Sequence, residues 1–406
     1  MDREQAVSYI GNLPKFSYPL GNEQLEKLLS LLGNPHKELK FIHIAGTNGK
    51  GSAAAMLGSI LENAGYRVGV FTSPYIIRFN ERIRLGRGEI PDNKLAEYTE
   101  RLADIIENNE IKLSQFAFIL ALALCYYRNE GCDLVVLEAG LGGRLDATNI
   151  IEESLVSVIM SIGLDHTEYL GTTIPEIARE KGGIIKENGS VAAYRSDKSA
   201  LDVFEQICRE KSARLYIAPK VQATEKGFAA DGREYALALK GEYQADNAAV
   251  VLKTVEILRE KGFAISENAL EKGFLSAQHR ARFERVRENI IVDGAHNSDG
   301  IRALCRALDS GAKTAVLAMM EDKAVDDALS QLKGFSEVIV TEIDMPRCMK
   351  AAELAKHAEK AGLNVRVIPD CTEAFKTAES CNFAVICGSI YLAGKALEYF
   401  DKKGVA

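Results

Sequence analysis

The residues best suited to chemistry in this chain form a glycine-rich segment, Gly46-Thr47-Asn48-Gly49-Lys50-Gly51-Ser52, directly after the apolar run 41–45. A glycine-rich loop between a buried strand and a helix presents backbone N–H groups to phosphate oxygens, and Lys50 adds a positive charge. The segment departs from the pattern G-x-x-x-x-G-K-[ST]. Ile44 and Gly51 stand where that pattern has a glycine and a hydroxyl, and Ser52 brings the hydroxyl one residue later. The spacing predicts a phosphate-binding loop, and the alternative is an ordinary glycine-rich turn.

Two further segments place acids and a histidine after apolar runs. Glu138 ends the run 134–137, and Asp165-His166 follow the run 155–162. In an open parallel sheet, ligands collect outside the carboxyl ends of the strands. We therefore expect these side chains to lie near the glycine-rich loop, where Glu138 could hold the Mg2+ of a nucleotide. Taken singly, Glu138 could be a salt-bridged carboxylate and His166 a structural histidine.

Other candidate residues lie further along the chain. Lys181 follows fifteen positions after His166, although a lone lysine on a helix is most often a solvated surface residue. The segment Asp293-Gly294-Ala295-His296-Asn297 again follows a strand-length run and lies a short distance beyond Arg282. Its simplest interpretation is a turn with a helix N-cap at Asn297 or Ser298. That interpretation is compatible with a role in a nucleotide site.

The elements that must position these residues alternate in type, which predicts an α/β fold. We expect a P-loop nucleotide-binding domain with a parallel sheet over residues 1–281 and a smaller, doubly wound, Rossmann-like domain over residues 282–406. The expected strands are 41–45, 67–71, 133–137, 155–162, 214–217, 235–239, 290–292, 314–318, 337–340, 365–368 and 384–386. The expected helices include 52–64, 116–127 and 174–181.

Composition excludes several classes of protein. Of the 406 residues 47% are hydrophobic and 26% charged, which is ordinary for a globular protein. The net charge of −7 argues against nucleic acid as a main partner. The longest apolar run, 116–127, is shorter than a bilayer requires, and the charged N-terminus lacks a signal-peptide core. The eight cysteines contain no C-x-x-C pair. We expect a cytoplasmic protein with reduced thiols and no membrane partner.

The segment 43–52 resembles the P-loop of folylpolyglutamate synthases and dihydrofolate synthases, ATP-dependent ligases of the Mur ligase superfamily. The other matching segments occur in the order of that family and cover nearly the whole chain. They are Thr72-Ser73-Pro74, 79–83, 138–149, 164–166, Glu180-Lys181, Gln244 with Asn247, Arg282-Phe283, 293–297, Pro346-Arg347 and Gly388-Ser389.

The resemblance implies a role for each matching residue. ATP is then held by Thr47, Asn48, Gly49, Lys50, Gly51, Ser52, Asn247, Arg282 and Asp293, and Mg2+ by Ser73, Glu138 and His166. The catalytic residues are Lys50, His166, Lys181 and His296, with Lys181 matching the family lysine that is carbamylated. The pterin substrate contacts Ser114, Phe116, Leu145, Asp146 and Ala147.

The resemblance implies a ligase that adds L-glutamate to folates through an acyl phosphate, with dihydropteroate as a further candidate acceptor. One segment departs from the family pattern, because Ala117 stands where Thr-x-Phe-Glu-like sequences have glutamate. The choice between folate and dihydropteroate therefore stays open, and we expect a monomer. The alternatives are a Mur-type ligase acting on another carboxylate and a P-loop regulatory ATPase.

Overall fold

The computed structural model describes residues 1–15, 21–308 and 313–404. The chain divides into two compact units, which we consider separately. Unit 1 contains residues 1–238 and 246–278, and unit 2 contains residues 239–245 and 279–406. Both units are α/β, as the alternation of apolar runs predicts.

Unit 1 is built on a mixed sheet with the strand order β4-β3-β2-β5-β1-β6-β7-β8. The strands from β2 to β8 in this order are parallel, while β3 and β4 form an antiparallel edge. Their bounds are β1 Phe41–Ala45, β2 Val68–Phe71, β3 Ile83–Leu85, β4 Gly88–Glu89, β5 Leu134–Glu138, β6 Val156–Ile159, β7 Ser190–Ala193 and β8 Arg214–Ile217. The central strands are buried on both faces, which explains their continuous apolar sequences.

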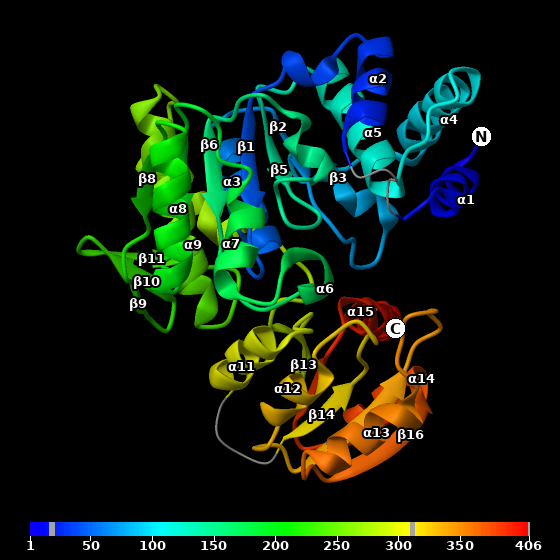
Figure 1. Cartoon of the computed structure of the whole chain (residues 1–406). Helices are drawn as coiled ribbons and strands as arrows, with labels where there is room; N and C mark the ends of the chain where they lie inside the picture. Colours follow the sequence, from blue (N-terminus) through cyan, green and yellow to red (C-terminus); the bar gives the residue numbers. More distant parts are fainter. Residues whose placement is uncertain (16–20, 309–312, 405–406) are drawn as a thin grey trace. The chain divides into compact units, whose positions relative to one another are not determined.

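Helices cover both faces of this sheet (Figure 1). The α-helices of unit 1 before residue 239 are α1 Arg3–Asn12, α2 Glu23–Leu31, α3 Lys50–Asn63, α4 Asp92–Asn108, α5 Gln115–Asn129, α6 Thr167–Leu170, α7 Ile174–Gly182 and α8 Lys198–Glu210. Three 3-10 turns are η1 Pro35–Lys37, η2 Phe79–Arg82 and η3 Ala147–Ile150. Side chains of α7 and α8 form one hydrophobic cluster with Ala45 and Ile159 of the sheet.

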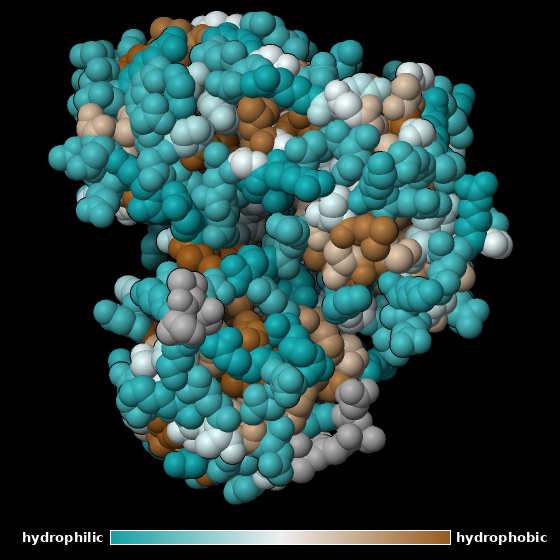
Figure 2. Space-filling model, turned by 180° about the vertical axis from the view of Figure 1, so that it is seen from behind, coloured by the Kyte–Doolittle hydropathy of each residue, from teal (hydrophilic) through white to brown (hydrophobic). Residues whose placement is uncertain are grey.

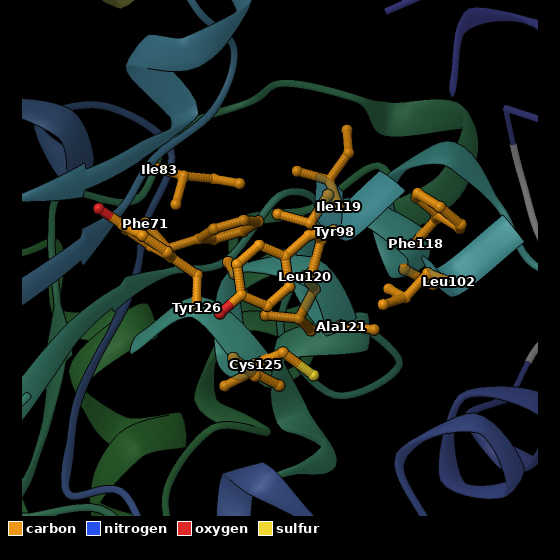
Figure 3. Packing of buried hydrophobic residues seen from close by; sticks show 14 of the residues in the cluster. Phe71, Ile83, Tyr98, Leu102, Phe118, Ile119, Leu120, Ala121, Cys125 and Tyr126 are labelled. Atoms are coloured by element: carbon orange, nitrogen blue, oxygen red, sulfur yellow. The ribbon is translucent and has the colours of Figure 1, made fainter. Parts of the chain in front are cut away.

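Helix α5 provides much of the core on that face (Figure 3). Its side chains from Phe118 to Tyr127 are buried, and they pack with Phe71 of β2 and with Leu102 of α4. Each fully buried large apolar side chain contributes roughly 1.5–3 kcal/mol by leaving water. The apolar run 116–127 is therefore a core helix.

The opposite face carries α3, which packs against α10. Gly273 of α10 lies directly on the backbone of α3, because a Cβ atom there would be 2.4 Å from the Cα of Ile60. The remaining elements before unit 2 are β9 Gln222–Ala223, β10 Gly227–Ala230, β11 Arg233–Ala236, α9 Tyr243–Glu260 and α10 Glu267–Ser276. The three strands form a small antiparallel sheet in the order β11-β10-β9.

Unit 2 contains a sheet with the order β12-β13-β17-β14-β15-β16, in which only β12 is antiparallel to its neighbour among the described strands. The bounds are β12 Glu284–Arg287, β13 Ile290–Val292, β14 Thr314–Leu317, β15 Glu337–Glu342, β16 Val365–Asp370 and β17 Ala384–Cys387. The helices are α11 Ser298–Ala307, α12 Val325–Ser330, α13 Ala351–Lys360, α14 Cys371–Glu379 and α15 Ile390–Gly404. This is the doubly wound arrangement that the sequence predicts.

Three of the differences between expected and observed element limits bear on the site or on strand pairing. The helix after the glycine-rich loop begins at Lys50 rather than at residue 52. The strand expected over 155–162 ends at Ile159, because Ser161 forms an isolated bridge with Asn48. The strand expected over 235–239 is Arg233–Ala236, which pairs in a hairpin with Gly227–Ala230.

The surface of each unit is predominantly hydrophilic on the face shown in Figure 2. No helix within the described ranges is both long enough and apolar enough to cross a membrane. All eight cysteines are free thiols.

Candidate active site

The glycine-rich loop connects β1 to α3, as expected for a phosphate-binding loop. Gly49 is the N-cap of α3 and has a φ of +89°, a region in which residues with a side chain are strained. A Cβ atom on Gly49 would lie 2.4 Å from Oδ1 of Asn247, so the loop and α9 approach closely here. Gly51 and Ser52 lie in the first turn of α3, and Ser52 is buried. The backbone N–H groups at this helix N-terminus are suited to phosphate oxygens.

Thr47 joins this loop to the segment that leads to Asp165 and His166. Its backbone N–H donates to Ser161 O at 2.7 Å, and its hydroxyl donates to Gly163 O at 3.0 Å. The same hydroxyl accepts from Gly163 N at 3.1 Å, and Ser161 Oγ donates to Asn48 O. The side chain of Thr47 is therefore used to hold two neighbouring loops together, while its backbone remains part of the phosphate-binding loop.

Two lysines donate to one carbonyl oxygen of the loop. Lys50 Nζ lies 3.0 Å from Gly46 O and 3.3 Å from Thr47 O, and Lys181 Nζ lies 3.0 Å from Gly46 O. Lys181 is only 4% exposed, because α7 buries its side chain against the loop. The interpretation of Lys181 as a solvated surface lysine is therefore wrong.

Glu138 lies at the carboxyl end of β5, beside Ile44 on the neighbouring strand β1. It is 3% exposed, and its Oε2 accepts from the backbone N–H of Ser73 at 3.2 Å. Among residues 1–15, 21–308 and 313–404, no three His, Cys, Asp or Glu side chains gather as a metal-ligand cluster. One carboxylate nevertheless fits Mg2+, since this ion is usually bound by one or two carboxylates together with substrate phosphates and water.

His166 and Asp165 follow β6 and approach the glycine-rich loop through the Thr47 contacts described above. His166 has a φ of +51° and its ring is about one-third exposed. Its Nε2 lies 4.0 Å from Oδ1 of Asp165, and its backbone N–H donates to the same oxygen at 2.9 Å. The left-handed backbone at His166 is unusual for a residue with a side chain and is typical of functional sites.

The residues expected to contact a pterin lie around the loop 139–147. Phe116 packs against Gly140, where a Cβ atom would lie 2.7 Å from the Phe116 ring, and edge-on against Phe71 at 5.6 Å. Asp146 is buried and caps η3, whereas Leu145 is 48% exposed and Ala147 packs against the core. Ser114 is the N-cap of α5, with its hydroxyl accepting from Ala117 N at 3.3 Å.

The backbone of this loop also packs against the end of α7. Arg144 N donates to Glu180 O at 2.7 Å, and Asn149 Nδ2 donates to Arg144 O and to Gly183 O. A Cβ atom on Gly143 would lie 2.8 Å from Lys181 O. The loop 139–147 and Lys181 are thus positioned by one set of contacts.

Arg282, Asp293 and His296 lie together in unit 2. Asp293 is 3% exposed, and its carboxylate accepts from Phe283 N, Ala295 N and the hydroxyl of Tyr243 at 2.7, 2.7 and 3.1 Å. Burial raises the pKa of Asp293, and the positive charge of Arg282 opposes that rise. His296 Nδ1 lies 2.9 Å from Gly294 O.

The helix cap expected at Asn297 or Ser298 is formed by Asn297, whose Oδ1 accepts from Gly300 N at 2.8 Å. The segment 293–297 therefore combines a cap with a buried carboxylate beside Arg282.

Three residues at these sites were not among the expected site residues, although His43 and Thr148 lie within the segments 43–52 and 138–149 that resemble the family. Tyr243 forms a hydrogen bond with Asp293. Thr148 forms one with Asp146, and His43 forms one with the hydroxyl of Thr148. His43 sits inside an apolar strand, where only its polarity among the apolar neighbours could have drawn attention to it.

The domains of this chain match two family models. The model described as "Mur ligase middle domain" matches residues 44–255, and "Mur ligase, glutamate ligase domain" matches residues 281–389. Together with the α/β fold of both units, these matches define the protein as an ATP-dependent ligase of the Mur ligase type.

Individual relatives indicate which family of Mur-type ligases is most similar to this chain. A Bacillus subtilis protein named dihydrofolate synthase/folylpolyglutamate synthase is 32% identical, with 96% of each chain covered. The folylpolyglutamate synthase of Mycobacterium tuberculosis complexed with ADP and AMPPCP has a TM-score of 0.87 at 29% identity and covers 98% of this chain and 99% of its own. The structure of E. coli FolC in complex with DHPP and ADP has a TM-score of 0.87 at 29% identity, and the match covers 100% of this chain and 99% of the FolC chain. The chain belongs to the dihydrofolate synthase/folylpolyglutamate synthase family.

Proposed function

We propose that this enzyme uses ATP to join L-glutamate to the carboxylate of a folate, and that dihydropteroate is a second candidate acceptor. The observation that carries the proposal is the meeting of Lys50 and Lys181 at Gly46 O, next to the strand end that bears Glu138. This arrangement supplies positive charge and a metal-binding carboxylate at one point. Relatives whose printed names give both synthase activities support the two acceptors.

The chemistry requires activation of a carboxylate, because oxide is a poor leaving group. In the proposed reaction the acceptor carboxylate attacks the γ-phosphorus of ATP, which forms an acyl phosphate and releases ADP. The amine of L-glutamate then attacks the acyl carbon, phosphate leaves, and the amine loses a proton as the amide forms. Two anions must approach each other in the first step, so cationic groups lower its barrier.

The chain's own residues divide this work. The loop 47–52 binds the phosphates through its N–H groups, and Lys50 stabilises the charge on the transferred phosphoryl group. Glu138, Ser73 and His166 would hold Mg2+, which when bound neutralises phosphate charge. Asn247, Arg282 and Asp293 would hold the remainder of ATP, and His296 would act near the reacting groups. Ser114, Phe116, Leu145, Asp146 and Ala147 would bind the pterin side of the acceptor.

Lys181 has a second proposed form, in which its amine is carbamylated. Lys181 is buried beside another cation on the same carbonyl oxygen, and like charges so placed repel each other. Reaction of the neutral amine with CO2 gives a carbamate and releases one proton, which replaces the second cation by an anionic metal ligand.

The test measures phosphate release by the purified protein with ATP, Mg2+ and L-glutamate, and product masses by mass spectrometry. Parallel reactions contain tetrahydrofolate, dihydropteroate or neither. We expect turnover only when an acceptor and glutamate are both present, with a product heavier by one glutamyl residue. Lys50→Ala should remove this activity, whereas Lys94→Ala, which changes a surface lysine paired with Glu97, should retain it.

The possible outcomes separate the alternatives. Turnover with both pterins indicates a bifunctional enzyme despite Ala117, and turnover with tetrahydrofolate alone restricts the enzyme to glutamate addition on folates. ATP hydrolysis that needs neither acceptor nor glutamate would contradict the ligase and favour a regulatory ATPase. Absence of turnover with both pterins would instead favour a ligase that acts on another carboxylate acceptor.

A further inference from the structure

A buried chain of hydrogen bonds links the strand before the P-loop to the loop 139–147, which we call the acceptor loop. His43 lies in the middle of β1 and has no exposed surface. Its Nε2 is 2.8 Å from Oγ1 of Thr148, and Thr148 Oγ1 is 2.5 Å from Oδ1 of Asp146. Thr148 itself is fully buried at the start of η3.

The direction of these hydrogen bonds follows from the donors around Asp146. Oδ1 of Asp146 accepts from Thr148 N at 2.9 Å, and its Oδ2 accepts from Leu141 N at 2.7 Å. Burial raises the pKa of Asp146, and the N–H donors on both of its oxygens oppose that rise and favour the carboxylate form. A carboxylate has no proton to donate, so the hydroxyl of Thr148 donates its single proton to Asp146. Nε2 of His43 must then carry a hydrogen and donate to Thr148, so His43 is the Nε2–H tautomer.

The other ring nitrogen agrees with this assignment. Nδ1 of His43 is buried and has no hydrogen-bond partner among the described residues. A bare nitrogen lone pair is a less costly group to leave unpaired there than an N–H, and a charged ring would be costlier still. Burial, together with the positive charge of Lys186, lowers the pKa of His43 to about 3. The ring is therefore neutral at physiological pH.

We infer that His43 and Thr148 are positioning residues, which fix the acceptor loop in register with the P-loop strand by holding Asp146. This inference rests on the proposed function, because the acceptor loop is the segment assigned there to the pterin substrate. The loop begins directly after Glu138, and its exposed part includes Leu145, whereas Asp146 closes its buried end. Neither His43 nor Thr148 needs to touch substrate, and the effect passes through Asp146.

The first experiment separates positioning from general stability by steady-state kinetics. Thr148→Val preserves the shape of the side chain and removes both hydroxyl hydrogen bonds, while Thr148→Ser keeps the hydroxyl. Thr99→Val is the matched control, since the Thr99 hydroxyl is equally buried and bonds only its own helix, at Leu95 O.

We expect Thr148→Val to raise KM for the pterin acceptor by about tenfold or more, in line with the loss of a hydrogen bond to a charged group. KM for ATP should stay within about twofold, and Thr148→Ser and Thr99→Val should resemble the wild type. Equal acceptor KM values in Thr148→Val and Thr99→Val would overturn the inference. A rise in KM for ATP as large as that for the acceptor would also overturn it.

The second experiment needs no activity and therefore tests the geometry if the proposed function fails. Selective 15N labelling of histidine, with His43→Gln for assignment, should show a neutral His43 ring protonated at Nε2, without titration above about pH 5. An Nδ1–H tautomer, or titration near the usual histidine range, would contradict the hydrogen-bond direction. Absence of any glutamylated product in the wild type would refute the proposed function instead.

Discussion

At the scale of single residues, the carbonyl of Gly46 is the most informative atom in unit 1. It accepts from both Lys50 and Lys181, which are 131 positions apart in the sequence and come from α3 and α7. Two lysines that meet at one carbonyl favour the binding of a polyanion, and the proposed carbamate would replace one of the two positive charges.

The proposed carbamate on Lys181 leads to a prediction. Lys181→Ala and Lys181→Arg should both lower kcat by about 10²-fold or more, because neither residue can carry the carbamate. Added formate or acetate should restore part of the activity of Lys181→Ala, since a small carboxylate can occupy the vacated space. The same salts should not help Lys181→Arg, in which the guanidinium fills that space.

Steady-state kinetics with and without the added salt provide the measurement. Full activity in Lys181→Arg would show that positive charge alone is needed at this position, and the carbamate would be excluded.

The buried His43 leads to a prediction about acid stability. Its pKa is about 3 in the folded protein and 6.5 in the unfolded chain, so the unfolded chain binds more protons between these values. The free energy of unfolding should therefore fall as the pH drops from 6.5 towards 3. This one group contributes a slope of up to about 1.4 kcal/mol per pH unit, which falls to half its maximum at pH 6.5 and fades about one pH unit above it.

Urea unfolding of the wild type and of His43→Gln at several pH values tests this slope. The difference in unfolding free energy between the two proteins should change with pH below 6.5 and become constant about one pH unit above it. Thr99→Val, a buried substitution that removes no titratable group, provides the control. A pH-independent difference for His43→Gln would contradict the predicted protonation behaviour.

At the scale of elements, α3 has a glycine with positive φ beside each of its ends, and the two glycines are needed for separable reasons. Gly49 has a positive φ and is in close approach to Asn247, whereas Gly65 has a φ of +90° with nothing within 4 Å of a Cβ atom. Gly65→Ala should therefore lower stability by about 1 kcal/mol through backbone strain alone. Gly49→Ala should in addition displace the loop from α9 and weaken ATP binding about tenfold or more.

Calorimetric titration with a non-hydrolysable ATP analogue, together with urea unfolding, distinguishes the two effects. Equal nucleotide affinity in the two variants would show that the contact between Gly49 and Asn247 does not position the loop.

The sequence predicts the central elements well because hydrophobic runs and loop chemistry agree there. The run 41–45 is β1, and Glu138 occupies the end of β5 next to it, as the carboxyl-end rule for parallel strands predicts. The antiparallel edge formed by β3 and β4 was not predicted, since these strands are short, and their pairing depends on the neighbouring β2.

The site is less predictable where a side chain forms hydrogen bonds with residues distant in the sequence. Thr47 belongs to an evident motif, yet its hydroxyl bonds Gly163, a partner that only the folded structure brings near. Thr148 and His43 have no recognisable spacing, because they lie 105 residues apart and only the fold brings η3 next to β1. Hydrophobic periodicity and local motifs predict elements and their neighbours along the chain, whereas such contacts depend on which elements are adjacent in space.

At the scale of the whole molecule, the two units have separate hydrophobic cores. Leu122 of α5 belongs to a core of unit 1, and Leu354 of α13 belongs to the core of unit 2. Both side chains have no exposed surface. Replacing either by alanine should cost about 2–5 kcal/mol through lost burial and the cavity left behind.

Native-state hydrogen exchange should show which strands lose stability in each variant. Leu122→Ala should accelerate exchange in β2 and β5, and Leu354→Ala should accelerate exchange in β14 and β15. Uniform acceleration throughout both units by either variant would show that the chain unfolds as one cooperative body.

The close approach of Gly273 to Ile60 has a consequence for genetics. Gly273 belongs to none of the motifs and lies in a helix that contributes no expected site residue, yet it packs against the helix that begins with Lys50. A random-mutagenesis screen for loss of nucleotide binding should therefore recover substitutions at Gly273. A map of such alleles on the linear sequence would suggest that residues around Gly273 contact the nucleotide. In the structure, Gly273 instead packs against α3, the helix that follows the phosphate-binding loop.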